Sequence, residues 1–229
     1  MFPLLQTRRL LALSLAAAFV ACAGGADARN DTSQALPAPD ETDLRVQRAD
    51  LARIMGDSTA RVWFVIVSDF QCPYCKMWHD SAGPEIKRDY LATGKIRLAY
   101  VNYPIPSLHA NAIPAAEAAM CAGAQGKFWA FHDQLFATQA DWARLDNARP
   151  FFDRLGSAVG LDAAAFSQCL RDDVMLPMVE ADLKRGRDGG VNGTPAFFIG
   201  SRLVKQNRPA SYLRPFLDSA IAEANRVAR

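Results

Sequence analysis

The sequence predicts one mixed α/β domain in which an all-helical segment interrupts the sheet. Two apolar runs at residues 62–67 and 96–101 have the length and β-branched content of buried strands, and a helical pattern separates them. Residues 107–189 contain no strand-like run, and two short strand patterns and a helix follow them. The chain has 229 residues, half of them apolar, which is enough for the core of one medium-sized domain.

Residues 1–28 have the pattern of an export signal rather than of folded structure. Arg8 and Arg9 form a short positive region, and the apolar stretch at residues 10–21 is too short to span a bilayer as a mature helix. The arginine pair also faintly resembles a twin-arginine signal. No second apolar run is long enough to cross a membrane, so we expect an exported protein with a soluble mature body.

Two cleavage sites fit this signal. Residues 19–22 resemble a lipobox, in which Cys22 would become a lipidated N-terminus and anchor the protein to the membrane. Residues 26–28 read Ala-Asp-Ala, which fits ordinary signal peptidase. Both alternatives place the mature protein in the periplasm or cell envelope.

Residues 29–49 are polar and show no apolar period, which predicts a flexible linker. We expect the folded domain at residues 50–229. Asp50 is a candidate N-cap for a short helix over residues 51–55, which Gly56 would end.

The charge balance argues against a nucleic-acid partner. The chain carries 26 basic and 24 acidic residues, for a formal charge of +2. Arg8 and Arg9, in the segment expected to be removed, account for that excess. A nearly neutral mature protein lacks the cationic surface that neutralises phosphates, and no glycine-rich phosphate loop is present.

Cys72 and Cys75 follow the first predicted strand directly and open a segment with helical character. Pro73 fits the first helical position, where its missing N–H costs nothing. Two cysteines at this spacing and at a strand-to-helix junction favour reversible disulfide chemistry. The alternatives are an inert structural disulfide and half of a zinc site.

The helix after Cys75 should kink at Pro84, which removes one hydrogen bond and clashes with the preceding turn. It resumes and stops at Gly94, because glycine readily adopts the left-handed conformation that ends many helices. The strand at residues 96–101 then completes a strand–helix–strand unit, which predicts parallel pairing of the two strands.

The long middle segment predicts several helices. Phe128, Phe131, His132, Leu135 and Phe136 recur at helical spacing, which is typical of a core stripe. Asp162 has the position of an N-cap. The expected helices cover residues 112–124, 149–159, 162–170 and 174–187.

The C-terminal part predicts a hairpin and a closing helix. Thr194 and Pro195 precede an apolar strand, where a proline is tolerated at the first position. Gly200 begins a tight turn, and residues 202–206 form the return strand. An amphipathic helix over residues 210–227 ends the fold.

These features together resemble the thioredoxin fold, and the helical insertion makes the chain similar to the DsbA-like branch of thiol–disulfide oxidoreductases. In the DsbA of enteric bacteria a histidine stands between the proline and the second cysteine, whereas this chain has Tyr74. The dipeptide Pro73-Tyr74 tunes the reduction potential, so the departure bears on oxidant strength. The resemblance rests on residues 68–75, 125–133 and 191–199.

The helix start assigns different chemistry to the two cysteines. At the N-terminus, Cys72 meets unpaired N–H groups and the helix dipole, which can lower a thiol pKa from about 8.5 to roughly 3.5–7.5. We expect Cys72 to be the attacking thiolate and the more buried Cys75 to resolve the mixed disulfide. Asp69 is either a proton carrier for Cys75 or a turn residue.

The resemblance implies a substrate-binding surface around the cysteines. It consists of Pro73, Tyr74, Thr194 and Pro195. The resemblance implies a cis bond before Pro195, which places the backbone of Thr194 beside the disulfide, where it can pair with an extended substrate.

Cys121 and Cys169 both fall in the helical insertion. Some DsbA-like proteins carry a second, non-catalytic disulfide in this region, and the resemblance therefore implies a structural disulfide here. Two buried free thiols are the alternative.

We predict no metal and no cofactor besides the redox-active cysteine pair. His79 lies one turn after Cys75, but zinc requires further ligands and no second Cys/His cluster is visible in the sequence. Lys76 follows Cys75 where covalent haem attachment needs a histidine.

The expected function is formation of disulfides in cysteine-containing exported proteins. The resemblance implies a membrane partner of the DsbB or vitamin-K-epoxide-reductase type that re-oxidises the enzyme, or reduces it if electrons run the other way. A reductase or isomerase of the same fold is one alternative. A non-enzymatic binding or chaperone module of the envelope is another.

Overall fold

The computed structural model of the chain describes residues 40–227. The predicted export signal, Cys22 and the first part of the predicted linker lie outside the described residues. No helix within residues 40–227 has the length and apolar character needed to cross a membrane.

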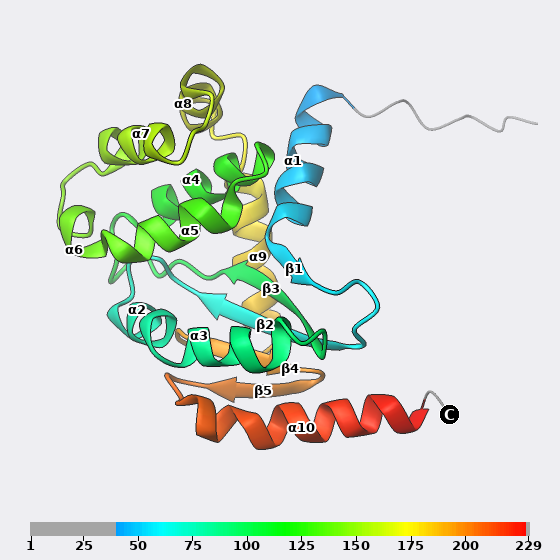
Figure 1. Cartoon of the computed structure of the whole chain (residues 1–229). Helices are drawn as coiled ribbons and strands as arrows, with labels where there is room; N and C mark the ends of the chain where they lie inside the picture. The colour runs from blue at the N-terminus through cyan, green and yellow to red at the C-terminus, as the bar shows by residue number, and fades with distance from the viewer. Residues whose placement is uncertain (1–39, 228–229) are drawn as a thin grey trace, which may run out of the picture. The chain divides into compact units, whose positions relative to one another are not determined.

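A five-stranded mixed sheet forms the centre of the described chain (Figure 1). The strand order is β1-β3-β2-β4-β5, with β2 and β3 parallel and the other neighbours antiparallel. The strands are β1 (Ile54–Gly56), β2 (Val62–Ser68), β3 (Ile96–Asn102), β4 (Ala196–Ile199) and β5 (Arg202–Lys205). The predicted parallel pair is therefore confirmed, with each strand one residue longer than expected.

The central strand β2 is covered on both faces. Phe64 and Ile66 belong to the main core, where the Phe64 ring stacks on Phe197 with centroids 5.6 Å apart. Val67 points to the opposite face and packs in a smaller cluster with Val191. Burial on both faces explains why β2 reads as a continuous apolar run rather than an alternating one.

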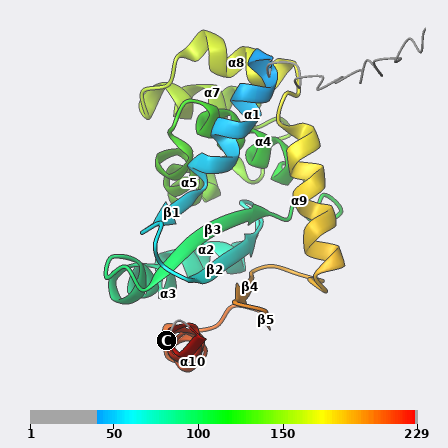
Figure 2. The same ribbon diagram turned by 90° about the vertical axis from the view of Figure 1, so that its right-hand side faces the viewer.

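Helices form layers on these two faces (Figures 1 and 2). The main core holds residues of α2 (Pro73–Asp80), α3 (Ala82–Ile86) and α10 (Ala210–Val227), and the π-helical turn η1 (Lys87–Leu91) follows α3. Helix α9 (Leu176–Asp188) lies on the other side of β2 and β3 in Figure 2. Gly186 of α9 allows close approach, because a Cβ there would lie 2.6 Å from the Tyr103 ring.

The helical insertion lies between β3 and β4, and this confirms the predicted fold class. Helix α4 is buried almost throughout, and the first helix α1 (Glu41–Ala52) packs against it so closely that a Cβ on Gly123 would lie 3.3 Å from the Ala49 backbone. The inserted helices before α9 are α4 (Ala112–Ala124), α5 (Phe128–Ala137), α6 (Gln139–Trp142), α7 (Arg149–Ala158) and α8 (Ala163–Arg171).

The start of the folded domain differs from the prediction. Residues 41–49, predicted as linker, belong to α1, whose N-cap Asp40 accepts a hydrogen bond from Asp43 N at 2.8 Å. The predicted helix over residues 51–55 is also wrong, because α1 ends at Ala52 and Ile54 begins β1. Helix α1 has a weak apolar stripe and gains its burial from α4, so its own sequence does not reveal it.

The helix breaks before Pro84, whereas the sequence predicts a kink at Pro84. Helix α2 ends at Asp80, and Ser81 leaves the helical region with φ −117° and ψ −82°. The proline ring clashes with the carbonyl four residues before it, which is that of Asp80. The helix therefore ends at Asp80, the residue whose carbonyl the Pro84 ring would contact.

Candidate active site

A tight turn carries the chain from β2 to Cys72. Asp69 organises it: its carbonyl accepts from Cys72 N at 3.1 Å, and its Oδ1 accepts from Gln71 N at 2.8 Å. Its other oxygen, Oδ2, accepts from Ile105 N at 3.0 Å and lies 2.7 Å from Nδ1 of His109. Of the two roles considered for Asp69, these contacts are those of the turn residue.

Cys72 is the N-cap of α2. Its backbone is extended, with φ −69° and ψ 123°, and Pro73 occupies the first helical position. The Cys72 side chain makes no capping hydrogen bond. The N–H of Cys75 donates to the Cys72 carbonyl at 3.1 Å. The N–H groups of Tyr74 and Cys75 also favour negative charge on the nearby sulfur.

The surroundings of Cys72 favour its thiolate. A hydrogen bond from the Cys75 thiol lowers the pKa of Cys72 most, and Thr194 and the N–H groups of Cys75 and Tyr74 lower it further, to about 6. At neutral pH the reduced protein therefore carries mainly a Cys72 thiolate, which is the nucleophilic form.

Cys75 has the opposite environment. Its side chain is buried, and burial raises the pKa of Cys75 well above the usual value, with the Cys72 charge raising it further. Both thiols are free in the structure. One cysteine is thus set up to attack and the other to stay protonated until it resolves the mixed disulfide.

Thr194 and Pro195 form the wall opposite the cysteines. The bond between them is cis, as the sequence analysis expects. The carbonyl of Thr194 lies 3.6 Å from the Cys72 sulfur. Pairing of Ala196 with Val67 joins β4 to β2 and fixes this wall next to the strand that delivers the cysteines.

Exposed apolar side chains lie on the helix that Cys72 begins and on the loop after β3. Tyr74 is 60% exposed and Met77 is 54% exposed on α2, and Leu108 is 74% exposed in the loop after β3. An open hollow of about 550 Å³ lies beside them, with Pro73 and His109 in its lining. Cys72 itself is only 4% exposed, so a partner must approach closely along this surface.

The contributions of two residues, His109 and Gln139, are absent from the sequence prediction. His109 is bound to Asp69, and this hydrogen bond is the main cause that raises the pKa of His109. Gln139 donates to the carbonyls of Phe70 and Cys72 at 2.7 and 3.1 Å, which ties the insertion to the active-site turn. These partners are 40 to 69 residues apart in the chain, and no local pattern signals them.

Lys76 is not a partner of the Cys72 thiolate. Its ammonium forms an ion pair with Asp80 at 2.8 Å on the exposed face of α2. Lys76 is therefore an ion-paired lysine of the helix surface.

His79, His132 and Asp133 come together on the flank of α2 and α5, with their ligand-type atoms within 4.8 Å of one another. Oδ1 of Asp133 lies 2.8 Å from Nδ1 of His132 and 3.1 Å from Nε2 of His79. The Lys87 ammonium is 3.9 Å from the same oxygen. A metal ion would have to break these hydrogen bonds and lie close to the Lys87 ammonium. The three residues therefore form a hydrogen-bonded network around the Asp133 carboxylate.

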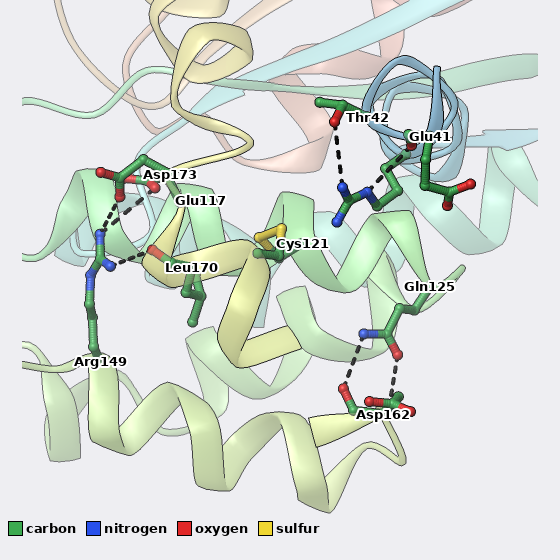
Figure 3. Close-up of a disulfide and its surroundings, with 11 residues drawn as sticks. Glu41, Thr42, Glu117, Cys121, Gln125, Arg149, Asp162, Leu170 and Asp173 are labelled. Atoms are coloured by element: carbon green, nitrogen blue, oxygen red, sulfur yellow. Dashed lines mark hydrogen bonds and ion pairs between the residues drawn. A yellow bond between two sulfur atoms is a disulfide. The ribbon is translucent and has the colours of Figure 1, made fainter. Parts of the chain in front are cut away.

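The second cysteine pair forms a disulfide (Figure 3). Cys121 of α4 and Cys169 of α8 are 48 residues apart in the chain. The same two helices are joined by Gln125, whose amide contacts the backbone of Asp162 at 2.8 and 3.3 Å. The disulfide thus joins two helices of the insertion that are also linked by hydrogen bonds, as expected for a structural bridge.

Residues 49–219 match the family model described as Thioredoxin. The chain belongs to the thioredoxin family. The match covers both cysteines of the α2 pair and the Thr194–Pro195 wall, together with the whole insertion.

Two groups of relatives are similar in sequence. The chain is 33% identical over 177 residues to the Na(+)/H(+) antiporter NhaA 1 of Salinispora arenicola, covering 76% of this chain but 25% of that protein. It is 26% identical over 172 residues to a putative protein-disulfide oxidoreductase of Rickettsia bellii, covering 75% of this chain and 65% of the relative. The chain thus spans about a quarter of the antiporter's length and about two thirds of the oxidoreductase's length.

Solved structures confirm the fold expected from the DsbA-like resemblance. Wolbachia pipientis alpha-DsbA1 superposes with a TM-score of 0.69 at 20% identity, covering 77% of this chain and 94% of that chain. Oxidised BdbD of Bacillus subtilis gives the same TM-score and identity, with 74% and 92% covered.

Proposed function

We propose that the protein is a thiol–disulfide oxidoreductase that forms disulfides in exported proteins through Cys72 and Cys75. The observation that supports this most is the asymmetry of the pair. Cys72 is a helix N-cap with its pKa lowered to about 6, and the pKa of Cys75 is raised. A stabilised Cys72 thiolate favours the reduced form of the pair, and it therefore makes the disulfide a better oxidant.

In the proposed reaction a substrate thiolate attacks the Cys72 sulfur of the oxidised pair. A disulfide forms between substrate and Cys72, the Cys72–Cys75 bond breaks, and Cys75 leaves with the electron pair and takes up a proton. A second substrate thiolate then attacks the substrate sulfur and releases Cys72 as the thiolate. The substrate is oxidised by two electrons and the protein is reduced.

The substrate surface is proposed to combine Pro73, Tyr74, Thr194 and Pro195. The exposed Tyr74 ring offers apolar contact, and the Thr194 carbonyl lies at the reacting sulfur. An extended segment of an unfolded protein has the free backbone groups and apolar side chains that such a surface binds.

Oxidation of a reduced peptide with two cysteines tests this function. The oxidised protein should convert the peptide to its disulfide within one turnover, as followed by mass spectrometry after acid quench. Cys72→Ser should abolish the reaction, whereas a Cys121→Ala/Cys169→Ala variant should retain it. Full activity of Cys72→Ser in the cell would favour a non-enzymatic binding module instead.

We further propose export by residues 1–28, with Cys22 as the lipid attachment site, and re-oxidation by a membrane protein of the DsbB or vitamin-K-epoxide-reductase type. Fractionation of cells that express the full chain tests the location. Cys22→Ser should release the protein from membranes if Cys22 is lipidated, and unchanged fractionation would contradict the anchor.

A further inference from the structure

A small cavity lies against Cys75 and Pro195. Cys75, Trp78, Tyr100, Trp129 and His132 are among its lining residues. Its volume is about 10 Å³, which is room for the centre of roughly one water molecule. Apart from Cys75, the proposed exchange does not use these side chains.

Three polar groups in the cavity lining have no protein partner. Within residues 40–227, nothing forms a hydrogen bond with the Tyr100 hydroxyl or with the indole N–H groups of Trp78 and Trp129. Tyr100 is 1% exposed and Trp78 is 4% exposed. Leaving one such group unpaired costs about 1–3 kcal/mol, so three around one small cavity indicate a shared ligand.

The lining also supplies acceptors. Burial lowers the pKa of His132 to about 4, so its ring is neutral at neutral pH. Its Nδ1 faces the Asp133 carboxylate at 2.8 Å and therefore carries the hydrogen, which leaves Nε2 as an acceptor. Cys75 is the second acceptor, because it becomes a thiolate when it leaves the disulfide.

We infer that one water molecule binds in this cavity and carries the proton between Cys75 and His132. Water accepts two hydrogen bonds and donates two, which matches the Tyr100 hydroxyl and one indole N–H as donors and Cys75 and His132 as acceptors. The Tyr100 hydroxyl orients the water. This inference rests on the proposed function and adds Tyr100 and His132 to it, Tyr100 as a positioning residue and His132 as a proton carrier.

The proton balance of the exchange follows from this arrangement. As the substrate thiolate displaces Cys75, Nε2 of the neutral His132 ring is transiently protonated. The water then gives a proton to the Cys75 thiolate and takes the one on Nε2. Solvent supplies that proton to His132, whose protonated ring the Asp133 carboxylate stabilises. During re-oxidation each transfer runs in reverse, and Cys75 loses its proton before it attacks the mixed disulfide.

Other ionisable groups lie beside His132 at the cavity. His79 and Lys87 line the same cavity, and His79 is hydrogen-bonded to Asp133 at 3.1 Å. Hydrogen bonds from His132 and His79 outweigh burial and hold the pKa of Asp133 well below its usual range. Asp133 thus remains a carboxylate that can steady a transient charge on His132.

Tyr100→Phe tests the inference with little disturbance, because it removes one oxygen that has no protein partner. The readout is the single-turnover rate with the two-cysteine peptide, measured across pH, together with the Cys72 pKa from thiolate absorbance. We expect His132→Gln to slow the reaction about a hundredfold, the low end of what proton-transfer assistance contributes. Tyr100→Phe should slow it in the same way. The Cys72 pKa should stay unchanged.

Tyr103→Phe is the matched control. Its hydroxyl is also buried but donates to the Val191 carbonyl at 2.8 Å, and its ring belongs to the cluster on the other face of the sheet. This variant should melt at a lower temperature and react at the wild-type rate. Equal slowing of Tyr103→Phe and Tyr100→Phe would show a general effect of core substitution and overturn the inference.

A crystal structure of the reduced wild type provides the second test. We expect electron density for one water within hydrogen-bond distance of the Tyr100 hydroxyl. A dry cavity, or a wild-type rate in Tyr100→Phe, would overturn the inference while leaving the proposed function intact. If the wild type itself fails to oxidise the peptide, the proposed function fails, and the density alone decides whether the water site exists.

Discussion

The two cysteine pairs of this protein differ in where their sulfurs lie on helices. Cys72 and Cys75 are one turn apart at the start of one helix, whereas Cys121 and Cys169 join two helices across 48 residues. The first pair has N–H groups directed at one sulfur and burial around the other. The second lies among packed helices. Position on the helix therefore separates a reactive pair from a structural one.

The helices that begin at Cys72 and at Asp162 make the same contrast. The Asp162 side chain caps α8 by accepting from Ala165 N at 2.8 Å. Cys72 occupies the same capping position on α2 and makes no such bond. A carboxylate caps the start of α8, whereas at the start of α2 the Tyr74 and Cys75 N–H groups favour a thiolate on Cys72.

The largest effect should come from Cys72→Ser. Serine lacks a stabilised anionic sulfur, so peptide oxidation should fall to the uncatalysed background, as measured by mass spectrometry of the quenched peptide. Cys121→Ala/Cys169→Ala is the matched control and should keep the wild-type rate. Loss of activity in that control, with the fold intact, would contradict the division of roles.

The same control variant should show the largest effect on stability. Removing a bridge that closes a 48-residue loop should lower the free energy of unfolding by about 4 kcal/mol on the chain-entropy model. Urea unfolding monitored by circular dichroism measures this. Stability equal to that of the wild type would mean that the disulfide does not constrain the unfolded chain.

The reduced protein should gain stability as the pH rises from about 6 to about 8.5. In this window the unfolded chain keeps the Cys72 proton and the folded chain has lost it, so stability rises with pH, by about 3 kcal/mol in all. The gain disappears as the pH falls through about 6.

The oxidised protein has no Cys72 thiol and serves as the control for this titration. The free energy of unfolding of both forms, measured across pH, should diverge only above about pH 6. Parallel curves would show that Cys72 has an ordinary pKa.

Cys75→Ala should raise the Cys72 pKa from about 6 by about one unit or more, because it removes the largest stabilising hydrogen bond. Absorbance of the thiolate at 240 nm follows the titration. An unchanged pKa would transfer the main role to the helix N–H groups and Thr194.

The smallest effect belongs to Asp162→Ala. Loss of the α8 cap should cost about 1 kcal/mol of stability and leave both the Cys72 pKa and the peptide oxidation rate unchanged. Denaturant unfolding and the thiolate titration check the two expectations. A shifted Cys72 pKa would show that the insertion influences the redox pair electrostatically.

Patterns that are local in the chain were predictable from the sequence. The β2 strand, the cysteine pair after it and α10 (Ala210–Val227) depend on neighbouring residues, and α10 has the predicted bounds. The start of the domain was not predictable, because β1 is a three-residue strand that exists through pairing with β3. Three residues are too few to show the alternation of apolar and polar side chains that predicts a strand.

In the active site, too, local features were predictable and long-range contacts were not. Cys72 at a helix start and Thr194-Pro195 before a strand are visible in the sequence, the second through family resemblance. The hydrogen bond between Asp69 and His109 and the contact of Gln139 with the Cys72 carbonyl are not, because folding brings together segments 40 and 67 residues apart. Burial of Cys75 and the cavity against it likewise arise only from packing.

The reduction potential of each cysteine pair tests the central comparison most directly, by equilibration with glutathione or dithiothreitol and mass spectrometry of alkylated thiols. We predict that Cys72–Cys75 lies between about −270 and −120 mV, on the oxidising side of thioredoxin, and that Cys121–Cys169 lies below about −300 mV. A Cys72–Cys75 potential at or below about −270 mV, or reduction of both pairs at one potential, would contradict the assignment of one pair to catalysis and the other to structure.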